Sequence, residues 1–84
     1  MQLGKHGVTV NAIVPGFVVS DMTRLSARRL GRTFEEFEDH ARQSIPVGRV
    51  GQPEDIAHTA SFLVSSGAGF VSGQVVYVAG GPVD

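Results

Sequence analysis

The chain has 84 residues, enough for one domain, and a formal net charge of −1 with its seven lysines and arginines dispersed. This balance provides no basic surface for nucleic acid or for an anionic membrane. The sequence contains no cysteine, which excludes disulfides, thiolate catalysis and cysteine-based zinc sites. No apolar run approaches the ~20 residues of a membrane span, so a soluble cytoplasmic protein is expected.

The first regular element is a predicted β-strand over residues 7–14, preceded by the end of a helix over residues 1–6. The valines of the strand alternate with other largely apolar residues, a pattern typical of a parallel strand that is covered on both faces. Pro15 cannot donate a ladder hydrogen bond and Gly16 can adopt a positive φ, so the strand is expected to stop there.

Residues 15–21 are predicted to form a loop at the carboxyl end of that strand, where open α/β sheets bind their ligands. Ser20 and Asp21 offer side-chain oxygens to the free N–H groups of a helix that begins near Met22. The loop is therefore expected to face a ligand.

Two short helices are predicted over residues 22–45, with an interruption at Gly31 and a capping box that starts the second helix at Thr33. Phe34 and Phe37 follow at helical spacing. They are interpreted as packing the helix against the core, as apolar stripes usually do.

A third helix over residues 53–65 begins with a proline and two acidic residues, and a second apolar strand follows over residues 74–79. A strand, helices and a second strand make a crossover that joins two parallel strands. Two such strands, apolar on both faces, need further partners to complete a sheet.

Metal and hydrolase chemistry find no support in the sequence. His6, His40 and His58 are isolated, and no pair has the spacing of a helical zinc site. A serine, histidine and aspartate are present, but no nucleophile elbow accompanies them. Asn11 lies inside the first strand and is interpreted as an amide bonded to neighbouring backbone.

Three motifs carry a family resemblance: VNAIVPGFVVSDMT, PVGRVGQPEDIAHTASFLVS and SGQVVYVAGG, in this order. Together they resemble the C-terminal third of the short-chain dehydrogenases/reductases, most closely the 3-oxoacyl-[acyl-carrier-protein] reductase group. The resemblance extends over residues 3–81. In the family the helices after the first of these motifs cover the substrate, so the resemblance implies a second interpretation of Phe34 and Phe37, as the lining of a pocket. It implies an α/β fold, namely the C-terminal part of a Rossmann-like doubly wound parallel sheet with its last two parallel strands and the intervening helices.

The resemblance also implies a cofactor, NAD or NADP, and places its nicotinamide beside the loop. Pro15 and Gly16 match the family's Pro-Gly turn, Val18 the residue whose backbone meets the carboxamide, and Ser20 a usual threonine. Judged without the family, the Pro-Gly pair is equally a simple strand terminator. A closing Gly-Gly pair is also matched, but Ala79 stands where the family has an acid or amide.

The family's catalytic groups are absent from these residues. No Gly-x-x-x-Gly-x-Gly loop is present to hold the pyrophosphate, and no Tyr-x-x-x-Lys pair, since the only tyrosine is Tyr77 in the second strand. The catalytic serine and asparagine likewise have no counterpart. The resemblance therefore implies a chain that begins after the catalytic helix and contributes no catalytic residue and no metal ligand.

Three functions are compatible with this pattern. The first is the C-terminal segment of an NAD(P)-dependent oxidoreductase for a carbonyl, alcohol or acyl-thioester substrate, which the family implies to be a homo-oligomer, a tetramer. The second is a non-catalytic module that docks through its sheet edge. The third is a truncated product without activity. An in-frame Tyr-x-x-x-Lys coding pattern upstream of Met1 would favour the first, and an in-frame stop codon the other two.

Overall fold

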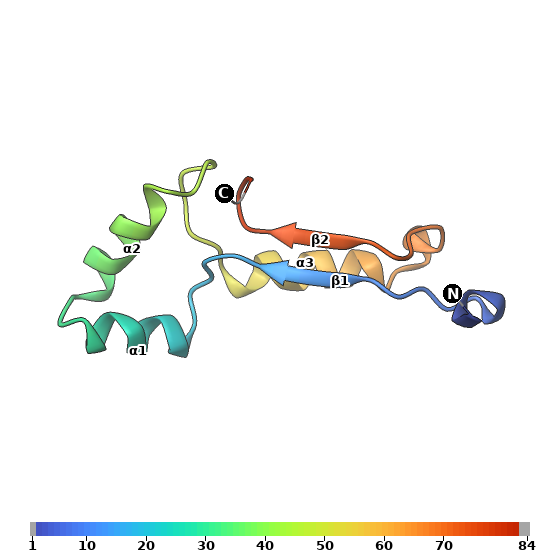
Figure 1. The fold of residues 1–84 in the computed structure, drawn as a ribbon, viewed down its shortest axis with the longest axis horizontal. Coiled ribbons are helices and arrows are strands. Elements are labelled where there is room, and N and C mark those ends of the chain that lie inside the picture. Colours follow the sequence, from blue (N-terminus) through green and yellow to red (C-terminus); the bar gives the residue numbers. More distant parts are fainter. Residues whose placement is uncertain (1, 83–84) are drawn as a thin grey trace.

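A computed structural model describes residues 2–82 (Figure 1). These residues form two strands, three α-helices and two short 3₁₀ helices. In chain order these are η1 (Gln2–His6), β1 (Ala12–Pro15), α1 (Asp21–Arg29), α2 (Phe34–Arg42), α3 (Pro53–Leu63), η2 (Ser66–Ala68) and β2 (Val75–Val78).

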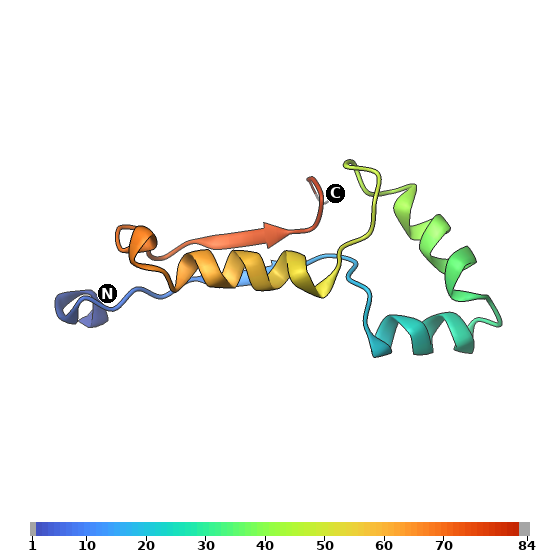
Figure 2. The same cartoon turned by 180° about the vertical axis from the view of Figure 1, so that it is seen from behind.

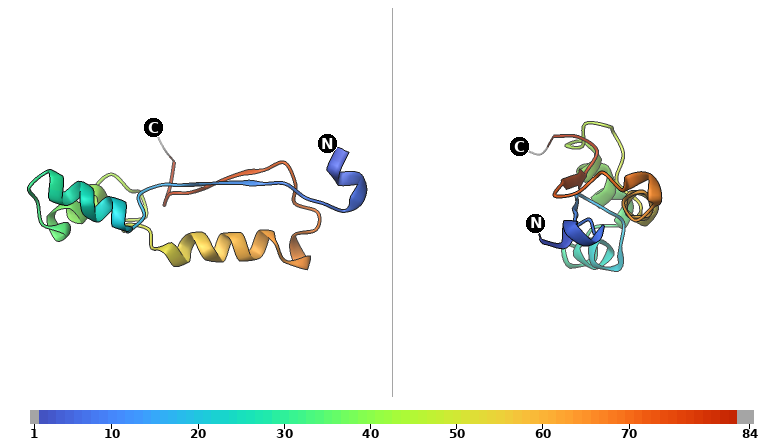
Figure 3. Two further views of the ribbon diagram at one scale, coloured as in Figure 1. Left: turned by 90° about the horizontal axis from the view of Figure 1, so that it is seen from below. Right: turned by 90° about the vertical axis from the view of Figure 1, so that its right-hand side faces the viewer.

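The two strands pair in parallel, with Ala12 opposite Val75 and Pro15 opposite Val78. The helix α3 runs along one face of this pair, as Figures 2 and 3 show from behind and from below. All three α-helices lie between β1 and β2 in the chain, so a crossover connects the strands. The α/β class with two parallel strands and intervening helices is thereby confirmed.

The ladder of β1 is shorter than residues 7–14, because regular pairing with β2 begins only at Ala12. Before that point the pairing is irregular, since the Val10 carbonyl accepts from the Gly73 N–H at 2.8 Å while the N–H of Val10 donates to Oγ of Ser72 at 3.2 Å. At the other end Pro15 still belongs to the strand. The N–H groups of Ala12 and Gly16 donate to the carbonyls of Gln74 and Val78, so a donor at position 15 would point away from β2, and a proline is tolerated there.

The remaining elements lie inside or close to their expected ranges. The turn before β1 is a 3₁₀ helix rather than an α-helical end, α1 begins at Asp21, and the expected strand over residues 74–79 is regular over Val75–Val78. Met1, the first residue of the expected helical end, lies outside the described residues.

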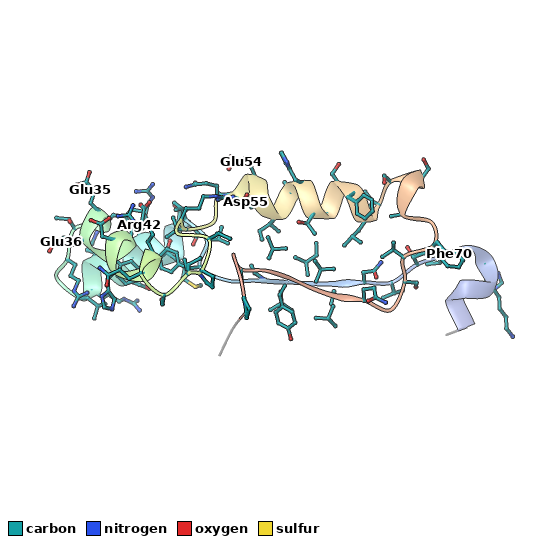
Figure 4. The ribbon with its side chains drawn as sticks, turned by 90° about the horizontal axis from the view of Figure 1, so that it is seen from above. Glu35, Glu36, Arg42, Glu54, Asp55 and Phe70 are labelled. Carbon is teal, nitrogen blue, oxygen red and sulfur yellow. The ribbon has the colours of Figure 1, made fainter. Side chains whose placement is uncertain are left out.

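A helix covers one face of the two-stranded sheet, and the other face is open. Ile13, Val76 and Val78 are half-buried on the side of α3, whereas Val14 and Tyr77 on the opposite side are 38% and 64% exposed. Figure 4 shows side chains on both sides of the strands and a helix on one side only. A sheet that is apolar on both faces is therefore covered on one.

The chain has a very small core. Among the described residues only Ala27, Val50 and Ala68 are buried. The accessible surface is 6353 Å², whereas a compact monomer of this mass exposes about 4,800 Å². The radius of gyration is 16.1 Å, against about 12 Å for a compact domain of this length. About 1,500 Å² of surface that a compact domain buries is open here.

The helices α1 and α2 form a hairpin beyond the carboxyl ends of the strands (Figure 1), and we call residues 21–42 the flap. The two helices pack on each other, and within residues 2–82 neither packs against β1, β2 or α3. The flap is thus a separate unit, joined to the sheet by two loops.

Purified alone, the chain is expected to self-associate or to remain partly ordered, because Val14, Val75 and Tyr77 leave an apolar face uncovered. Size-exclusion chromatography with light scattering and a thermal melt measure this. Tyr77→Lys should reduce the association, whereas the control Met22→Lys, at an exposed apolar position of the flap, should leave it largely unchanged. A monodisperse monomer with a cooperative transition would contradict the prediction.

Candidate nicotinamide-side loop

The candidate site starts where β1 ends, at a close approach of two backbones. The N–H of Gly16 donates to the carbonyl of Val78 at 3.0 Å, and a methyl group on Gly16 would lie 2.6 Å from Cβ of Ala79. Gly16 does not adopt a positive φ, contrary to the expectation from sequence. Glycine is required here because there is no room for a side chain, and this contact brings the two strand ends together.

The loop after Gly16 is held on one side by the segment that precedes α3. Val18 forms a parallel bridge with Gly51, in which Gly51 N–H donates to the Phe17 carbonyl at 2.8 Å and Val19 N–H donates to the Gly51 carbonyl at 2.9 Å. Alternate residues of an extended chain point their amides in opposite directions. The N–H of Val18 therefore points away from Gly51, and it has no hydrogen-bond partner within residues 2–82.

Ser20 is the N-cap of α1, and its hydroxyl accepts from the N–H of Thr23 at 3.2 Å. Thr23 reciprocates, because its Oγ1 accepts from the N–H of Ser20 at 2.8 Å. This pair is a capping box in which threonine takes the place of the usual glutamate or glutamine. Sequence reasoning missed Thr23, although the Ser-x-x-Thr spacing was the available signal. A hydroxyl that accepts from an amide keeps its own proton, so Ser20 can still donate to a ligand.

An ion pair fixes the segment that carries Gly51. The guanidinium of Arg49 donates to both carboxylate oxygens of Asp55, at 2.9 and 3.0 Å, and the N–H of Gln52 donates to the same carboxylate at 2.7 Å. The Arg49 bonds, followed by the Gln52 amide, hold the pKa of Asp55 well below its usual range. Figure 4 shows Asp55 at the start of α3. Sequence reasoning assigned Asp55 only to the helix dipole, because nothing local indicates Arg49 as its partner.

The aromatic residues of the flap have defined partners. The ring of Phe37 lies 5.5 Å from that of Phe17, between centroids, and the guanidinium of Arg24 lies 4.5 Å above the ring of Phe34. Both flap phenylalanines are half-buried, which fits the packing interpretation. Phe17, directly after Gly16, was not singled out from sequence, since a single aromatic in a loop has no periodic pattern to mark it.

Two hollows lie near this loop. One of about 410 Å³ has mainly apolar walls from the loop, the end of α2 and the residues after β2, namely Gly16, Phe17, Ala41, Ser44, Ile45, Pro46, Ala79, Gly81 and Pro82. A smaller one of about 80 Å³ adjoins Phe17, Arg49 and Asp55. A hollow of about 730 Å³, larger than either of these, lies between the end of α3 and the residues that precede β1. It reflects the uncovered flank of the sheet rather than the chemistry of the loop.

The closing Gly-Gly pair packs under the segment that leaves the flap. Gly80 adopts a φ of 79° and Gly81 a φ of 144°, and added methyl groups would collide with Val47 and Pro46 respectively. The Val47 N–H donates to the Gly80 carbonyl at 2.9 Å. Both glycines are therefore required by backbone conformation and by close packing.

Asn11 has a structural role, as expected from sequence. Its amide donates to the Val71 carbonyl at 3.1 Å and its oxygen accepts from the Gln74 N–H at 3.0 Å. Within residues 2–82 no group of three or more His, Asp or Glu side chains is placed to bind a metal ion. In the same part of the chain no helix has the length and apolar character to cross a membrane.

Comparison with known proteins decides the family. Residues 1–82 match the sequence model of a family described as enoyl-(acyl carrier protein) reductase. The chain belongs to the short-chain dehydrogenases/reductases. It is 46% identical over 80 residues to the short-chain reductase protein NovJ of Streptomyces niveus, and 40% identical over 80 residues to the 3-oxoacyl-[acyl-carrier-protein] reductase FabG of Staphylococcus epidermidis. Each alignment covers 95% of this chain and 30% of the relative.

Solved short-chain dehydrogenase/reductase structures agree with the fold. YwfH, described as an NADPH-dependent reductase, matches 99% of this chain with a TM-score of 0.86 and 32% identity, and the match covers 33% of YwfH. A short chain dehydrogenase family protein from Francisella tularensis matches 95% of this chain with a TM-score of 0.83 and 30% identity, covering 35% of that protein. The chain thus spans about a third of the length of its relatives.

Lowering the pH should loosen the start of α3. The stabilisation from the depressed pKa of Asp55 is fully present above the usual aspartate range, near 4, and is lost as the pH falls through the lowered folded-state pKa. Asp55→Asn should therefore reduce helix content, measured by circular dichroism, at pH 7 but not at pH 1. The control Glu54→Gln, one residue earlier, should change little. If the helix content of Asp55→Asn is still reduced at pH 1, the stabilisation does not come from the ionised Asp55 carboxylate.

Proposed function

We propose that this chain supplies the nicotinamide side and the substrate flap of an NAD(P)-dependent oxidoreductase, in which hydride passes between the cofactor and a carbonyl or hydroxyl carbon. The observation that carries the proposal is the backbone of Val18. It lies beyond the carboxyl end of the sheet, is pinned by Gly51 on one side and leaves its N–H without a partner within residues 2–82 on the other. An amide held in this way is prepared for a ligand.

The residues present fit the carboxamide end of a nicotinamide. The Val18 N–H can donate to the carboxamide oxygen, and the Ser20 hydroxyl can donate while it caps α1. Pro15 ends β1, and Gly16 lets the loop pass close to the end of β2, where no side chain would fit. The role of these four residues is to bind and orient, and the flap limits the access of water.

The acid–base chemistry must come from groups other than these. Tyr77 is 64% exposed in the middle of β2, on the sheet face opposite α3, and cannot reach the loop beyond the strand end. The chain also carries no glycine-rich loop for the pyrophosphate. We therefore assign the proton donor and the phosphate site to a part of the enzyme outside these 84 residues.

The names of the relatives indicate which substrate and which cofactor to test first. FabG of Staphylococcus epidermidis is a 3-oxoacyl-[acyl-carrier-protein] reductase, which supports a 3-oxoacyl thioester as the first substrate to test. The description of YwfH as NADPH-dependent supports NADPH as the first cofactor to test, with NAD(H) as the comparison. We further propose a cytoplasmic homo-oligomer, a tetramer, with the outer edge of β2 at Val75 and Tyr77 in a subunit contact.

A non-catalytic docking module is the second candidate, and the uncovered sheet supports it. Each strand pairs with one neighbour, so one edge of β1 and one edge of β2 are open within residues 2–82. Open edges recruit strands from other chains. A truncated product without activity is the third candidate, and the coding sequence upstream of Met1 separates it from the first.

The 84-residue chain alone is expected to show no reductase activity with NADPH or NADH. A hybrid, in which this chain replaces the matched C-terminal segment of Staphylococcus epidermidis FabG, is expected to bind NADPH and to oxidise it with a 3-oxoacyl thioester. Protein-dependent NADPH oxidation by the chain alone, lost on denaturation, would contradict the first expectation. A folded hybrid that binds no cofactor would contradict the proposed function.

Ser20→Ala in the hybrid should weaken NADPH binding several-fold, because one hydrogen bond contributes roughly 0.5 to 1.5 kcal/mol. Ser20→Thr keeps the hydroxyl and should bind as the unmodified hybrid does. Fluorescence titration gives the affinities, and thermal melts report the cap, whose loss costs about 0.5 to 2 kcal/mol of stability. Thr23→Ala removes the other half of the capping box and is the matched control. Unchanged affinity in Ser20→Ala with a lowered melting temperature would restrict Ser20 to capping.

A further inference from the structure

The flap is attached to the sheet in an unusual way. Within residues 2–82 its two helices pack against no strand and not against α3. Its entry loop and its exit segment meet at the bridge between Val18 and Gly51. The position of the flap over the strand ends is therefore set by these loops and by the side chains that reach across to them.

Phe17 makes such a contact from a rigid base. Its carbonyl accepts from Gly51 N–H at 2.8 Å, its neighbour Gly16 is locked against β2, and its ring lies 5.5 Å from the ring of Phe37 at an interplanar angle of 50°. Tilted aromatic pairs at this distance are attractive beyond the area that they bury. Phe37 thus ties the flap to a loop that has little freedom to move.

The two helices of the flap are joined to each other, so a contact with one helix also positions the other. The Arg24 guanidinium of α1 lies 4.5 Å above the Phe34 ring of α2, so the two helices are joined by a cation–π contact. The end of α2 supplies Ala41, a wall of the hollow of about 410 Å³ that also borders Phe17. A shift of the flap away from Phe17 would therefore change the shape of this hollow.

We propose that Phe17 is a positioning residue that couples the cofactor loop to the flap through its contact with Phe37. This inference rests on the proposed function, in which the next residue, Val18, binds the carboxamide. Cofactor bound at Val18 adds a contact on the side of the loop that Gly51 leaves open, and it thereby removes the residual motion of the loop and of the Phe17 ring. That ring then holds Phe37 and the flap in place, so cofactor binding and flap closure support each other.

The rate of cleavage by trypsin reports the position of the flap and does not depend on reductase activity. The flap and its connecting turn contain five exposed arginines, namely Arg24, Arg28, Arg29, Arg32 and Arg42. The hybrid reductase is the sample, and mass spectrometry identifies the cleaved bonds. Phe37→Leu should accelerate cleavage at these arginines about two- to tenfold, the range expected for the loss of one aromatic pair. The control Phe70→Leu, at a fully exposed ring in the turn before β2, should not.

A double-mutant cycle distinguishes the loss of the contact between Phe17 and Phe37 from a general loosening of the flap. If Phe17 and Phe37 act through each other, the variant carrying both Phe17→Leu and Phe37→Leu should be cleaved no faster than the quicker single variant. Phe37→Tyr keeps a ring and should restore slow cleavage. Multiplicative effects of the two single substitutions would overturn the proposal, as would cleavage of Phe37→Leu at the rate of the unmodified hybrid.

A separate experiment measures the coupling between cofactor binding and the position of the flap. Saturating NADPH should slow cleavage of the flap in the hybrid by several-fold, and this protection should be lost in Phe17→Leu at NADPH concentrations that still saturate it. Equal protection of both proteins would overturn the coupling while leaving cofactor binding intact. If the hybrid binds no NADPH, the proposed function fails, whereas the cycle without cofactor still tests the contact between Phe17 and Phe37.

Discussion

The parallel pairing of β1 with β2 is the constraint on which the rest of this structure depends. Parallel strands bring their carboxyl ends to the same edge, so the loop after Gly16 and the residues after Val78 meet there. The contact between Gly16 and Ala79 closes that end too tightly for a side chain. The loop, the bridge to Gly51 and the flap all take their positions from this one edge.

The same pairing leaves a large apolar surface open. A strand pair of this kind is apolar on both faces, but α3 covers one face only, and Val14, Val75 and Tyr77 remain exposed on the other. Hydrophobic burial is the main favourable term of folding, and the described residues, of which three are buried, obtain little of it. The open surface and the match to about a third of each relative both agree with the proposal that this segment belongs to a larger enzyme.

The polar contacts around the loop cap two helices and also order the backbone beside Val18. Ser20 and Thr23 close the start of α1, and Arg49 and Asp55 close the start of α3, so both segments beside Val18 are fixed by local bonds. A ligand that binds Val18 therefore meets a backbone that is already ordered and loses little entropy on binding. The four proposed cofactor residues are thus better described as a supported backbone surface than as a set of reactive side chains.

The sequence by itself determined the elements and their order, because alternating valines, a capping box at Thr33 and a proline at the start of α3 are local signals. It also determined the family, through three spaced motifs that the comparisons confirm. Only the tertiary structure decided that Gly16 is required for close packing rather than for its φ, and that Phe17 meets Phe37. Both depend on residues distant along the chain, and such contacts leave no local pattern from which they can be predicted.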